Sequence, residues 1–363
     1  MGWRCGIIGL PNAGKTTIFN ALTAAQAEVA AYPFCTISPN SGVVPVPDPR
    51  LAQLGELLKP ERLTPTTINF VDVAGLIAGA SKGEGLGNQF LGQIRDTDLI
   101  VHVVRCFADG RCPHPLGAVD PVRDVEVVET ELMLADLEIL ERHRVKLEKR
   151  RKAGDKQAEA DLNLVARVET GLNQGLWAKD LGLKPEELAR LAEVPLLTLK
   201  PYLFVANVSE EESNEGPCLR ALRDLGRKRG VPVIPILGDL EAELVDLSPE
   251  EQKEFLQSLG LAEPGINRLI QESYRLLGLV TFYTIVGSEV RAWTVPAGTT
   301  APKAAGQVHS DMEKGFIRAE VMRFADLARL GSAAKIKEAG LLSVEGRDHV
   351  VEDGEILLFR FQA

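Results

Sequence analysis

The octapeptide GLPNAGKT, residues 9–16, decides the fold of this chain. It follows the short apolar stretch Arg4–Ile8, which has a strand pattern, and it precedes the helical pattern Thr16–Ala24. In this strand–loop–helix setting the spacing G-x-x-x-x-G-K-T predicts a phosphate-binding loop. Its glycines let the backbone curl so that successive N–H groups face phosphate oxygens, and the helix N-terminus adds its positive end. The sequence therefore predicts a P-loop nucleoside triphosphatase.

The side chains of this loop have separate expected roles. Lys15 is predicted to neutralise the β- and γ-phosphates as the catalytic cation, and Thr16 is predicted to offer its hydroxyl to Mg²⁺, the expected cofactor. The nucleotide-binding residues predicted in this segment are Asn12, Ala13, Gly14, Lys15, Thr16 and Thr17.

Two segments downstream complete the predicted site. Asp72 ends an apolar run and is expected to hold Mg²⁺ through water, and the N–H of Gly75 is expected to sense the γ-phosphate. Thr36, in the segment YPFCT, supplies a second hydroxyl for the metal. A metabolic kinase would share the P-loop but would not need both segments, so their order favours a switch protein whose loops respond to the γ-phosphate. The glycine-rich stretch 75–87 is then predicted to be a mobile switch.

The apolar runs along the chain predict an α/β fold. They cover residues 4–8, 68–73, 99–104, 202–206 and 231–237, with helical or turn-rich stretches between them. This alternation is typical of parallel βαβ units in an open sheet. From 279 onward, short alternating strands and one short helix predict a separate α+β module of about 80 residues.

A long insertion at 122–200 interrupts this alternation. Two amphipathic segments, Val125–Lys152 and a second one after Gly154, predict an antiparallel helical hairpin. Its tip is basic, with Arg142, Arg144, Lys146, Lys149, Arg150, Arg151, Lys152 and Lys156. Composition leaves two interpretations open, a solvated helix surface or an RNA contact.

Composition and charge exclude several classes of protein. The net charge of −10 over 363 residues argues against non-specific nucleic-acid binding by the whole surface. Five scattered cysteines, an odd number, predict no disulfide framework and suit a reducing cytoplasm. We expect a cytoplasmic protein with no secretion signal and no membrane contact, because no apolar run has the length to cross a bilayer.

Five longer stretches make the chain recognisable. They are GLPNAGKTTIFNALT (9–23), YPFCTISPNSGVV (32–44), FVDVAGLIAGASKGEGLGNQFL (70–91), RAWTVPAGTTAPKAAGQVHSDMEKGFIRAEV (291–321) and EGRDHVVEDGEILLFRF (345–361). With these stretches the chain closely resembles the YchF family, the Obg-like ATPases of the translation-factor-related P-loop class. They are spread from end to end, and the C-terminal match separates this family from its relatives.

The resemblance implies three domains. They are a discontinuous Ras-like nucleotide-binding domain over 1–278, the helical hairpin inserted at 122–200, and a C-terminal TGS domain of ubiquitin-like β-grasp fold over 279–363. It also implies hydrolysis of ATP in preference to GTP, binding to the ribosome, with the large subunit as the expected contact, and roles in translation or stress responses. The RNA contacts would use the basic hairpin tip and the TGS domain.

The base-reading segment bears on the choice between ATP and GTP. GTPases of this class usually carry Asn-Lys-x-Asp, whereas this chain has Asn207-Val208-Ser209-Glu210. A carboxylate still accepts hydrogen bonds, so chemistry alone does not exclude guanine. The resemblance implies that Asn207, Val208 and Glu210 contact the base in the ATP-accepting form.

The position that orients the attacking water also departs from the common pattern. Leu76 stands where many relatives carry a glutamine, and leucine makes no hydrogen bond. The resemblance points to His114 as the catalytic residue that replaces this glutamine. A loop histidine with no catalytic role is the alternative.

Two further functions remain open at this point. One is an Obg-like GTPase in ribosome maturation, which nucleotide competition would separate from an ATPase. The other is an RNA-binding scaffold that holds its nucleotide as a structural ligand, which multiple turnover would exclude.

Overall fold

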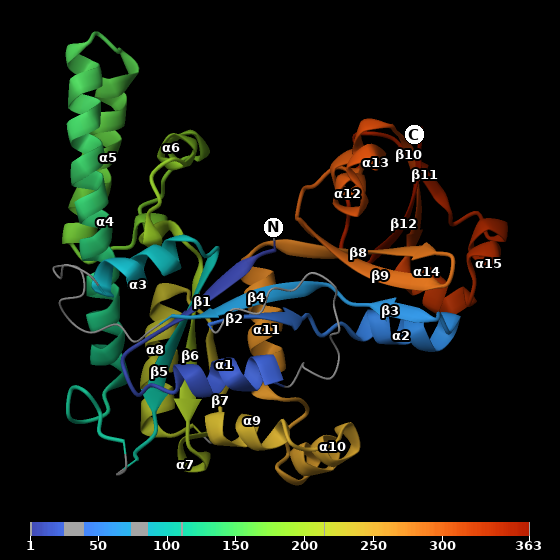
Figure 1. Cartoon of the computed structure of the whole chain (residues 1–363), viewed down its shortest axis with the longest axis horizontal. Coiled ribbons are helices and arrows are strands. Elements are labelled where there is room, and N and C mark those ends of the chain that lie inside the picture. The colour runs from blue at the N-terminus through green and yellow to red at the C-terminus, as the bar shows by residue number, and fades with distance from the viewer. Residues whose placement is uncertain (1, 25–39, 74–85, 110–111, 214, 363) are drawn as a thin grey trace. The chain divides into compact units, whose positions relative to one another are not determined.

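The computed structural model of the chain describes residues 2–24, 40–73, 86–109, 112–213 and 215–362 (Figure 1). The chain divides into two compact units. Unit 1 comprises residues 1–43 and 69–269, and unit 2 comprises residues 44–68 and 270–363.

Unit 1 is built on a six-stranded sheet with the order β2-β4-β1-β5-β6-β7. The strands are β1 (Arg4–Ile8), β2 (Ser41–Pro45), β4 (Thr67–Asp72), β5 (Leu99–Cys106), β6 (Tyr202–Val208) and β7 (Val233–Ile236). The pairs β1–β4, β1–β5, β5–β6 and β6–β7 are parallel, so the ends of these strands meet at one edge. Every residue of β5 and β6 is buried, as expected for central strands of a parallel sheet. The predicted α/β fold is confirmed.

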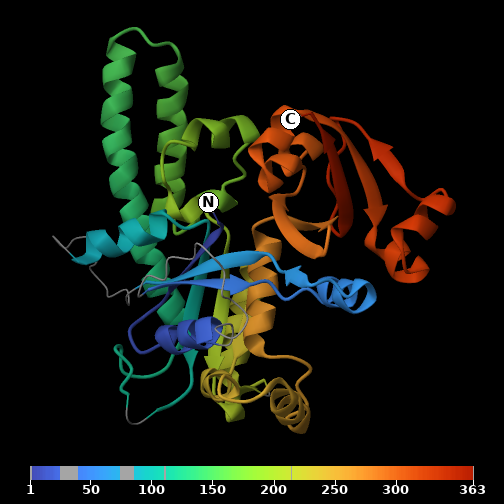
Figure 2. The ribbon, with the colours of Figure 1, turned by 45° about the vertical axis from the view of Figure 1, so that its right-hand side comes forward.

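Helices complete unit 1 around this sheet (Figures 1 and 2). They are α1 (Lys15–Ala24), α3 (Leu86–Arg95), α4 (Pro121–Lys152), α5 (Gln157–Asn173), α6 (Pro185–Leu191), α7 (Glu210–Ser213), α8 (Pro217–Arg229), α9 (Gly238–Leu244), α10 (Pro249–Ser258) and α11 (Gly265–Leu276), whose last turns enter unit 2. Side chains of α3, α4 and α8 share one core cluster with the strands. No described helix is both long and apolar enough to cross a membrane.

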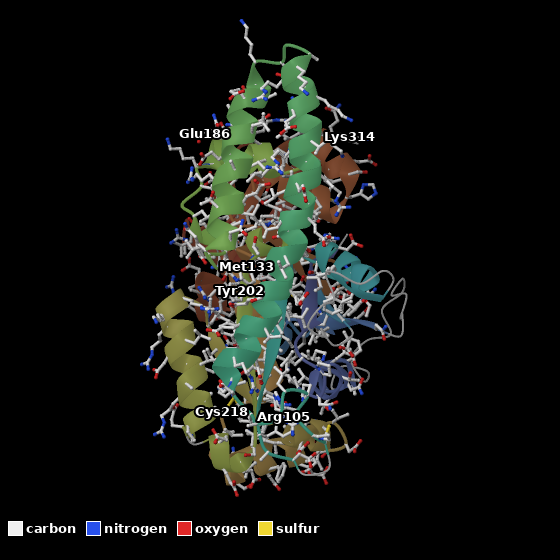
Figure 3. The ribbon with its side chains drawn as sticks, turned by 90° about the vertical axis from the view of Figure 1, so that its left-hand side faces the viewer. Arg105, Met133, Glu186, Tyr202, Cys218 and Lys314 are labelled. Carbon is white, nitrogen blue, oxygen red and sulfur yellow. A yellow bond between two sulfur atoms is a disulfide. The ribbon has the colours of Figure 1, made fainter. Side chains whose placement is uncertain are left out.

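The long helices α4 and α5 lie side by side, as two views show (Figures 1 and 3). Leucines and valines of both helices, Leu140 and Val165 among them, form a shared apolar cluster. Asp136 fixes the base of this pair, because its buried carboxylate accepts hydrogen bonds from Leu197 N, Thr198 N and Thr198 Oγ1 at 2.7–2.8 Å. At the far end, Arg150 pairs with Asp155 at 2.7 Å and Arg151 with Glu159 at 3.3 Å. Part of the predicted basic charge is therefore neutralised within the tip.

Unit 2 contains a second six-stranded sheet with the order β11-β10-β12-β8-β9-β3. Its strands are β3 (Arg62–Thr64), β8 (Leu279–Val286), β9 (Glu289–Pro296), β10 (Phe316–Arg323), β11 (Ser343–Glu345) and β12 (Glu355–Phe361). Its helices are α2 (Pro49–Leu58), α12 (Ala301–Val308), α13 (Ser310–Lys314), α14 (Phe324–Leu330) and α15 (Ala333–Glu338). Strand β8 pairs antiparallel with β9 and parallel with β12, so the sheet is mixed.

Residues 44–68 pack in unit 2, whereas the sequence analysis placed them in the nucleotide-binding domain. The reason is a set of long-range contacts that local patterns do not reveal. Arg50 pairs with Asp353 at 2.7 Å across 303 positions of the chain, and the buried Tyr283 donates its hydroxyl hydrogen to Asp48. Strand β3 also extends the second sheet beside β9.

The sequence predicted no disulfide framework, and the structure contains one disulfide. Cys106 at the end of β5 and Cys218 at the start of α8 are joined, 112 positions apart, with their Cα atoms 5.5 Å apart. Cys112 is a free thiol. An odd cysteine count says nothing about which strand and helix ends the fold brings together.

Glu241 in α9 ties this helix to the start of α11. Its side chain is buried, and Oε1 accepts a hydrogen bond from Gly265 N at 2.5 Å, while Oε2 has no partner among the described residues. Burial raises the pKa of Glu241 from 4.5 to about 7, although backbone hydrogen bonds from Gly265 and Ile266 oppose the shift. The folded chain therefore retains this proton at pH values at which an unfolded chain has lost it.

The substitution Glu241→Gln tests this environment. Because the folded pKa lies above the unfolded one, the stability contributed by the protonated carboxyl is lost as pH rises from 4.5 through about 7. The variant side chain is neutral at every pH. From pH 5 to pH 8 we therefore expect the free energy of unfolding of the variant to rise by about 1–3 kcal/mol relative to that of wild type. Thermal unfolding at both pH values measures this. Glu243→Gln, an exposed position of the same helix, is the control, and equal changes in both variants would contradict the assignment.

Candidate functional site

The phosphate-binding loop Gly9–Gly14 connects β1 to α1 at the edge where the parallel strands end. Three of its residues have a positive φ, Gly9 at 149°, Asn12 at 63° and Gly14 at 90°. A Cβ atom on Gly14 would lie 2.0 Å from Asn207 Nδ2, so only glycine fits there. The loop thus has the backbone that the motif requires.

Asn207, the last residue but one of β6, fastens this loop to the start of α9. Its Nδ2 donates to the carbonyl of Ala13 at 3.1 Å, and its Oδ1 accepts from Gly238 N at 3.2 Å. The side chain is buried, which strengthens both bonds. Val208 is also buried, whereas Glu210 lies in the exposed first turn of α7. Of the predicted base-reading segment, Asn207 thus contacts the phosphate loop.

The predicted metal ligands Thr16 and Asp72 are in contact. Thr16 Oγ1 donates to Asp72 Oδ2 at 2.8 Å, and Asp72 Oδ1 is buried with no hydrogen-bond partner among the described residues. Mg²⁺ prefers such hard oxygen donors and usually completes its shell with phosphates and waters. These two residues fit the ion.

Lys15 lies at the start of α1 with its side chain almost completely buried. Its Nζ donates to the carbonyl of Leu10 at 2.8 Å, within the same loop. Burial lowers the pKa of Lys15, and the negative charge of Asp72 opposes this shift. A poorly solvated ammonium gains more from a phosphate than one exposed to water. Thr17 follows as a half-buried residue of the same helix.

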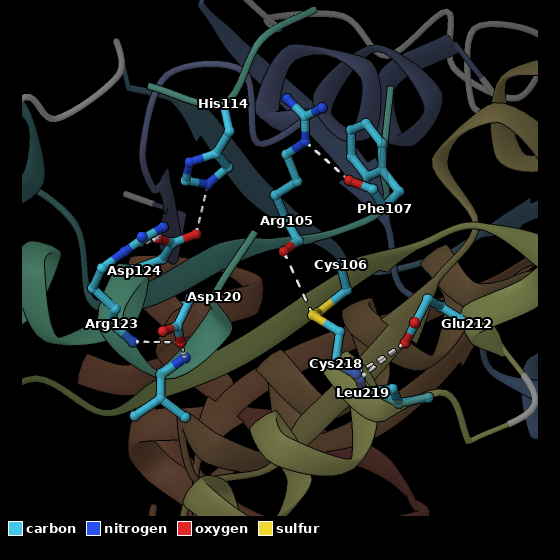
Figure 4. Close-up of a disulfide and its surroundings, with 11 residues drawn as sticks. Arg105, Cys106, Phe107, His114, Asp120, Arg123, Asp124, Glu212, Cys218 and Leu219 are labelled. Carbon is cyan, nitrogen blue, oxygen red and sulfur yellow. Dashed lines mark hydrogen bonds and ion pairs between the residues drawn. A yellow bond between two sulfur atoms is a disulfide. The ribbon is translucent and has the colours of Figure 1, made fainter. Parts of the chain in front are cut away.

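His114 lies in the loop between β5 and α4, and both of its ring nitrogens make hydrogen bonds. Figure 4 shows the one to Asp124. Nε2 is 2.7 Å from Asp124 Oδ2, and Nδ1 accepts a hydrogen bond from Leu116 N at 3.1 Å. Since Nδ1 accepts, the proton is on Nε2, which donates it to Asp124. The ring is 4% exposed, so it has to leave this position before it can contact a water molecule.

The other predicted residues of the site are Thr36, Gly75 and Leu76, all of which lie outside the described residues. The structure therefore brings together the P-loop, Asp72 and Asn207. His102 is buried in β5, and burial lowers its pKa to about 3.

Comparison with known proteins places this geometry in a family. A family model described as 50S ribosome-binding GTPase matches residues 4–171, and one named YchF-GTPase_C, described as a protein of unknown function, matches residues 279–362. The ribosome-binding ATPase YchF of Haemophilus influenzae is 51% identical over 361 residues, which cover 99% of each chain. That of Bacillus subtilis is 44% identical over 366 residues, which cover 99% of this chain and 100% of the relative.

A solved structure agrees. The YchF GTPase of Schizosaccharomyces pombe is 32% identical, with a TM-score of 0.90 over 99% of this chain and 98% of that one. This chain belongs to the YchF family. The resemblance noted in the sequence is thereby confirmed.

One residue near the YchF nucleotide site was not identified from the sequence. Arg105 is buried near the end of β5, and its guanidinium contacts the phosphate-binding loop. The available signal was an arginine immediately after the apolar run 99–104, directly before the loop that carries His114. A charged residue in a buried strand requires hydrogen-bond partners, which points to a structured loop nearby.

Proposed function

We propose that this chain is a Mg²⁺-dependent ATPase that binds ribosomes in the cytoplasm and changes its loops with the state of the γ-phosphate. The observation that carries the proposal is the contact between Thr16 and Asp72 beside the P-loop, with one carboxylate oxygen left free of described partners. The relatives named ribosome-binding ATPase, similar over almost their whole length, support the same function.

Different residues of the chain have separate roles in hydrolysis. Lys15 holds the β- and γ-phosphates, and the loop amides around Ala13 orient them. Bound Mg²⁺ would neutralise developing charge on the phosphate oxygens, with Thr16, Asp72 and Thr36 as its protein ligands. Water attacks the γ-phosphorus, the bond to the bridging oxygen breaks, and ADP and phosphate leave. We assign the orientation of that water to His114, and sensing of the γ-phosphate to Gly75.

The preference for ATP rests on the segment Asn207-Val208-Ser209-Glu210. In place of the lysine of the guanine-reading motif stands Val208, which is buried, and Glu210 is exposed and one methylene longer than aspartate. GTP hydrolysis is the second candidate, because a matching family model and the solved relative are both described as GTPases.

Titration of one preparation with ATP and GTP separates these candidates. We expect ATP to bind at least several-fold tighter, since a tenfold ratio needs only about 1.4 kcal/mol. Multiple turnover of ATP should be lost in Lys15→Ala, which removes a charge-assisted phosphate contact worth about 1.5–3 kcal/mol. Lys228→Ala, at an exposed position of α8, is the matched control. Tighter binding of GTP would make the protein a GTPase, and wild-type turnover by Lys15→Ala would disprove the site.

The assignment of His114 predicts slow turnover until its loop moves. His114→Ala should reduce single-turnover ATP cleavage at saturating nucleotide, because positioning and general-base effects contribute typically about 10²–10⁴-fold. Since Asp124 and Leu116 hold the ring, we expect the larger reduction with ribosomes present. His309→Ala, at an exposed position of unit 2, serves as control for cleavage without ribosomes. Unchanged rates in both conditions, with nucleotide affinity intact, would remove His114 from the mechanism.

We propose that the protein contacts the large ribosomal subunit through two surfaces. One is the basic tip of the α4–α5 pair, which we interpret as the family's inserted helical hairpin. The other is unit 2, whose mixed sheet and packed helix α12 we interpret as a TGS domain of β-grasp fold. Both would contact RNA through exposed basic side chains.

Removing the three adjacent charges Arg150, Arg151 and Lys152 by alanine substitution tests the first contact. Each charge that pairs with phosphate contributes to the salt dependence, and two of the three charges would first have to leave Asp155 and Glu159, so the log–log slope of affinity against salt should fall by about 1–3. The control removes three exposed basic residues of α8, Arg220, Arg227 and Lys228. Equal affinity and slope in wild type and tip variant would place the contact elsewhere.

A further inference from the structure

Arg105 lies in β5, a strand in which every residue is buried, and it is only 3% exposed. Its guanidinium is surrounded by backbone carbonyls of the loop that follows β5. Nε donates to Phe107 O at 3.1 Å, and Nη2 donates to Cys112 O at 2.9 Å and Asp109 O at 3.5 Å. The guanidinium also stacks over the Phe107 ring, 4.4 Å from its centroid (Figure 4).

The fourth carbonyl belongs to the phosphate-binding loop. Arg105 Nη1 donates to Asn12 O at 3.3 Å. Asn12 in turn contacts the loop after β5, where its Nδ2 donates a hydrogen bond to Pro113 O at 3.2 Å. The two loops are therefore joined twice, once by a guanidinium and once by a carboxamide.

Holding the Asn12 carbonyl has a direct consequence for phosphate binding. The C=O of Asn12 and the N–H of Ala13 belong to one peptide, and in a trans peptide they point in opposite directions. Fixing the carbonyl toward Arg105 therefore fixes the Ala13 N–H toward the other side, where P-loop amides meet phosphate oxygens. Asn12 has a φ of 63°, in the left-handed region that residues other than glycine rarely adopt. Local backbone preference therefore does not hold this peptide in place, and the contact with Arg105 does.

The strand end that carries Arg105 is itself held from its other face. Successive side chains of a strand point to opposite faces, so Cys106 points away from Arg105 and is joined to Cys218 of α8 (Figure 4). The carbonyl of Arg105 lies 3.7 Å from Cys218 Sγ. The guanidinium thus projects from a rigid support.

We propose that Arg105 is a positioning residue for the nucleotide site. Its guanidinium holds the Asn12–Ala13 peptide and the carbonyls of Phe107, Asp109 and Cys112 in one arrangement, so that the phosphate amides and the residues just before His114 are set by the same group. The proposal rests on the proposed ATPase function. A lysine would keep the charge but lose the planar fork that reaches several carbonyls at once, so geometry and charge can be tested separately.

The test compares Arg105→Met and Arg105→Lys with Arg167→Met. Arg167 also donates to loop carbonyls, those of Leu181 and Gly182, but in the helical insertion, far along the chain from the P-loop. Dissociation constants for ADP, ATP and adenosine are measured on each protein, together with thermal unfolding. Adenosine lacks phosphates, so it reports on the base pocket alone.

We expect both Arg105 variants to bind ADP and ATP at least about tenfold more weakly, with adenosine binding unchanged, and Arg167→Met to bind all three as wild type does. If Arg105→Met does not fold, Arg105→Lys decides, because it keeps the buried charge. Wild-type affinity for ADP in Arg105→Lys, or an equal loss for ADP and adenosine, would overturn the positioning role. Failure of the wild-type protein to hydrolyse ATP would instead disprove the proposed function, whatever the variants do.

Discussion

The nucleotide site depends on the side-chain carboxamide of Asn207. One atom of this group donates to the P-loop at Ala13 and the other accepts from Gly238, so two loops from different parts of the sheet edge are held at a fixed separation. The bond has room only because residue 14 is glycine, since a Cβ there would lie 2.0 Å from the amide nitrogen. Because Asn207 is buried, losing either bond would leave a polar group without a partner. Arg105 holds the same loop through Asn12.

Around this loop the charges are arranged for phosphate. Lys15 is buried with its ammonium turned onto a loop carbonyl, and Asp72 is its nearby counter-charge. Thr16 and Asp72 hold one another, and one buried carboxylate oxygen has no described partner. Because Lys15 is buried, its attraction to phosphate is stronger than it would be in water. His114 is the exception, because its ring is fastened to Asp124 and Leu116 and has to move before it can act.

Local sequence patterns were enough to predict the parts of this molecule that repeat a known chemistry. GLPNAGKT predicted the phosphate loop, and the apolar runs predicted the α/β fold. Contacts between residues that are far apart in the sequence could not be predicted from local patterns. Arg50 meets Asp353 only after folding, so residues 44–68 could not be assigned to unit 2. The Cys106–Cys218 pair and the contact of Arg105 with Asn12 likewise depend on which ends the parallel strands bring to one edge. The roles of Thr36 and Gly75 stay predictions.

We propose that the contact between Thr16 and Asp72 marks the Mg²⁺ site of an ATPase. Steady-state phosphate release from ATP by the purified protein, followed as Mg²⁺ is titrated from zero, tests this proposal. We expect no release without the metal and a rate that rises and saturates as Mg²⁺ is added. Phosphate release that is independent of Mg²⁺, or no release at any concentration of the ion, would contradict it.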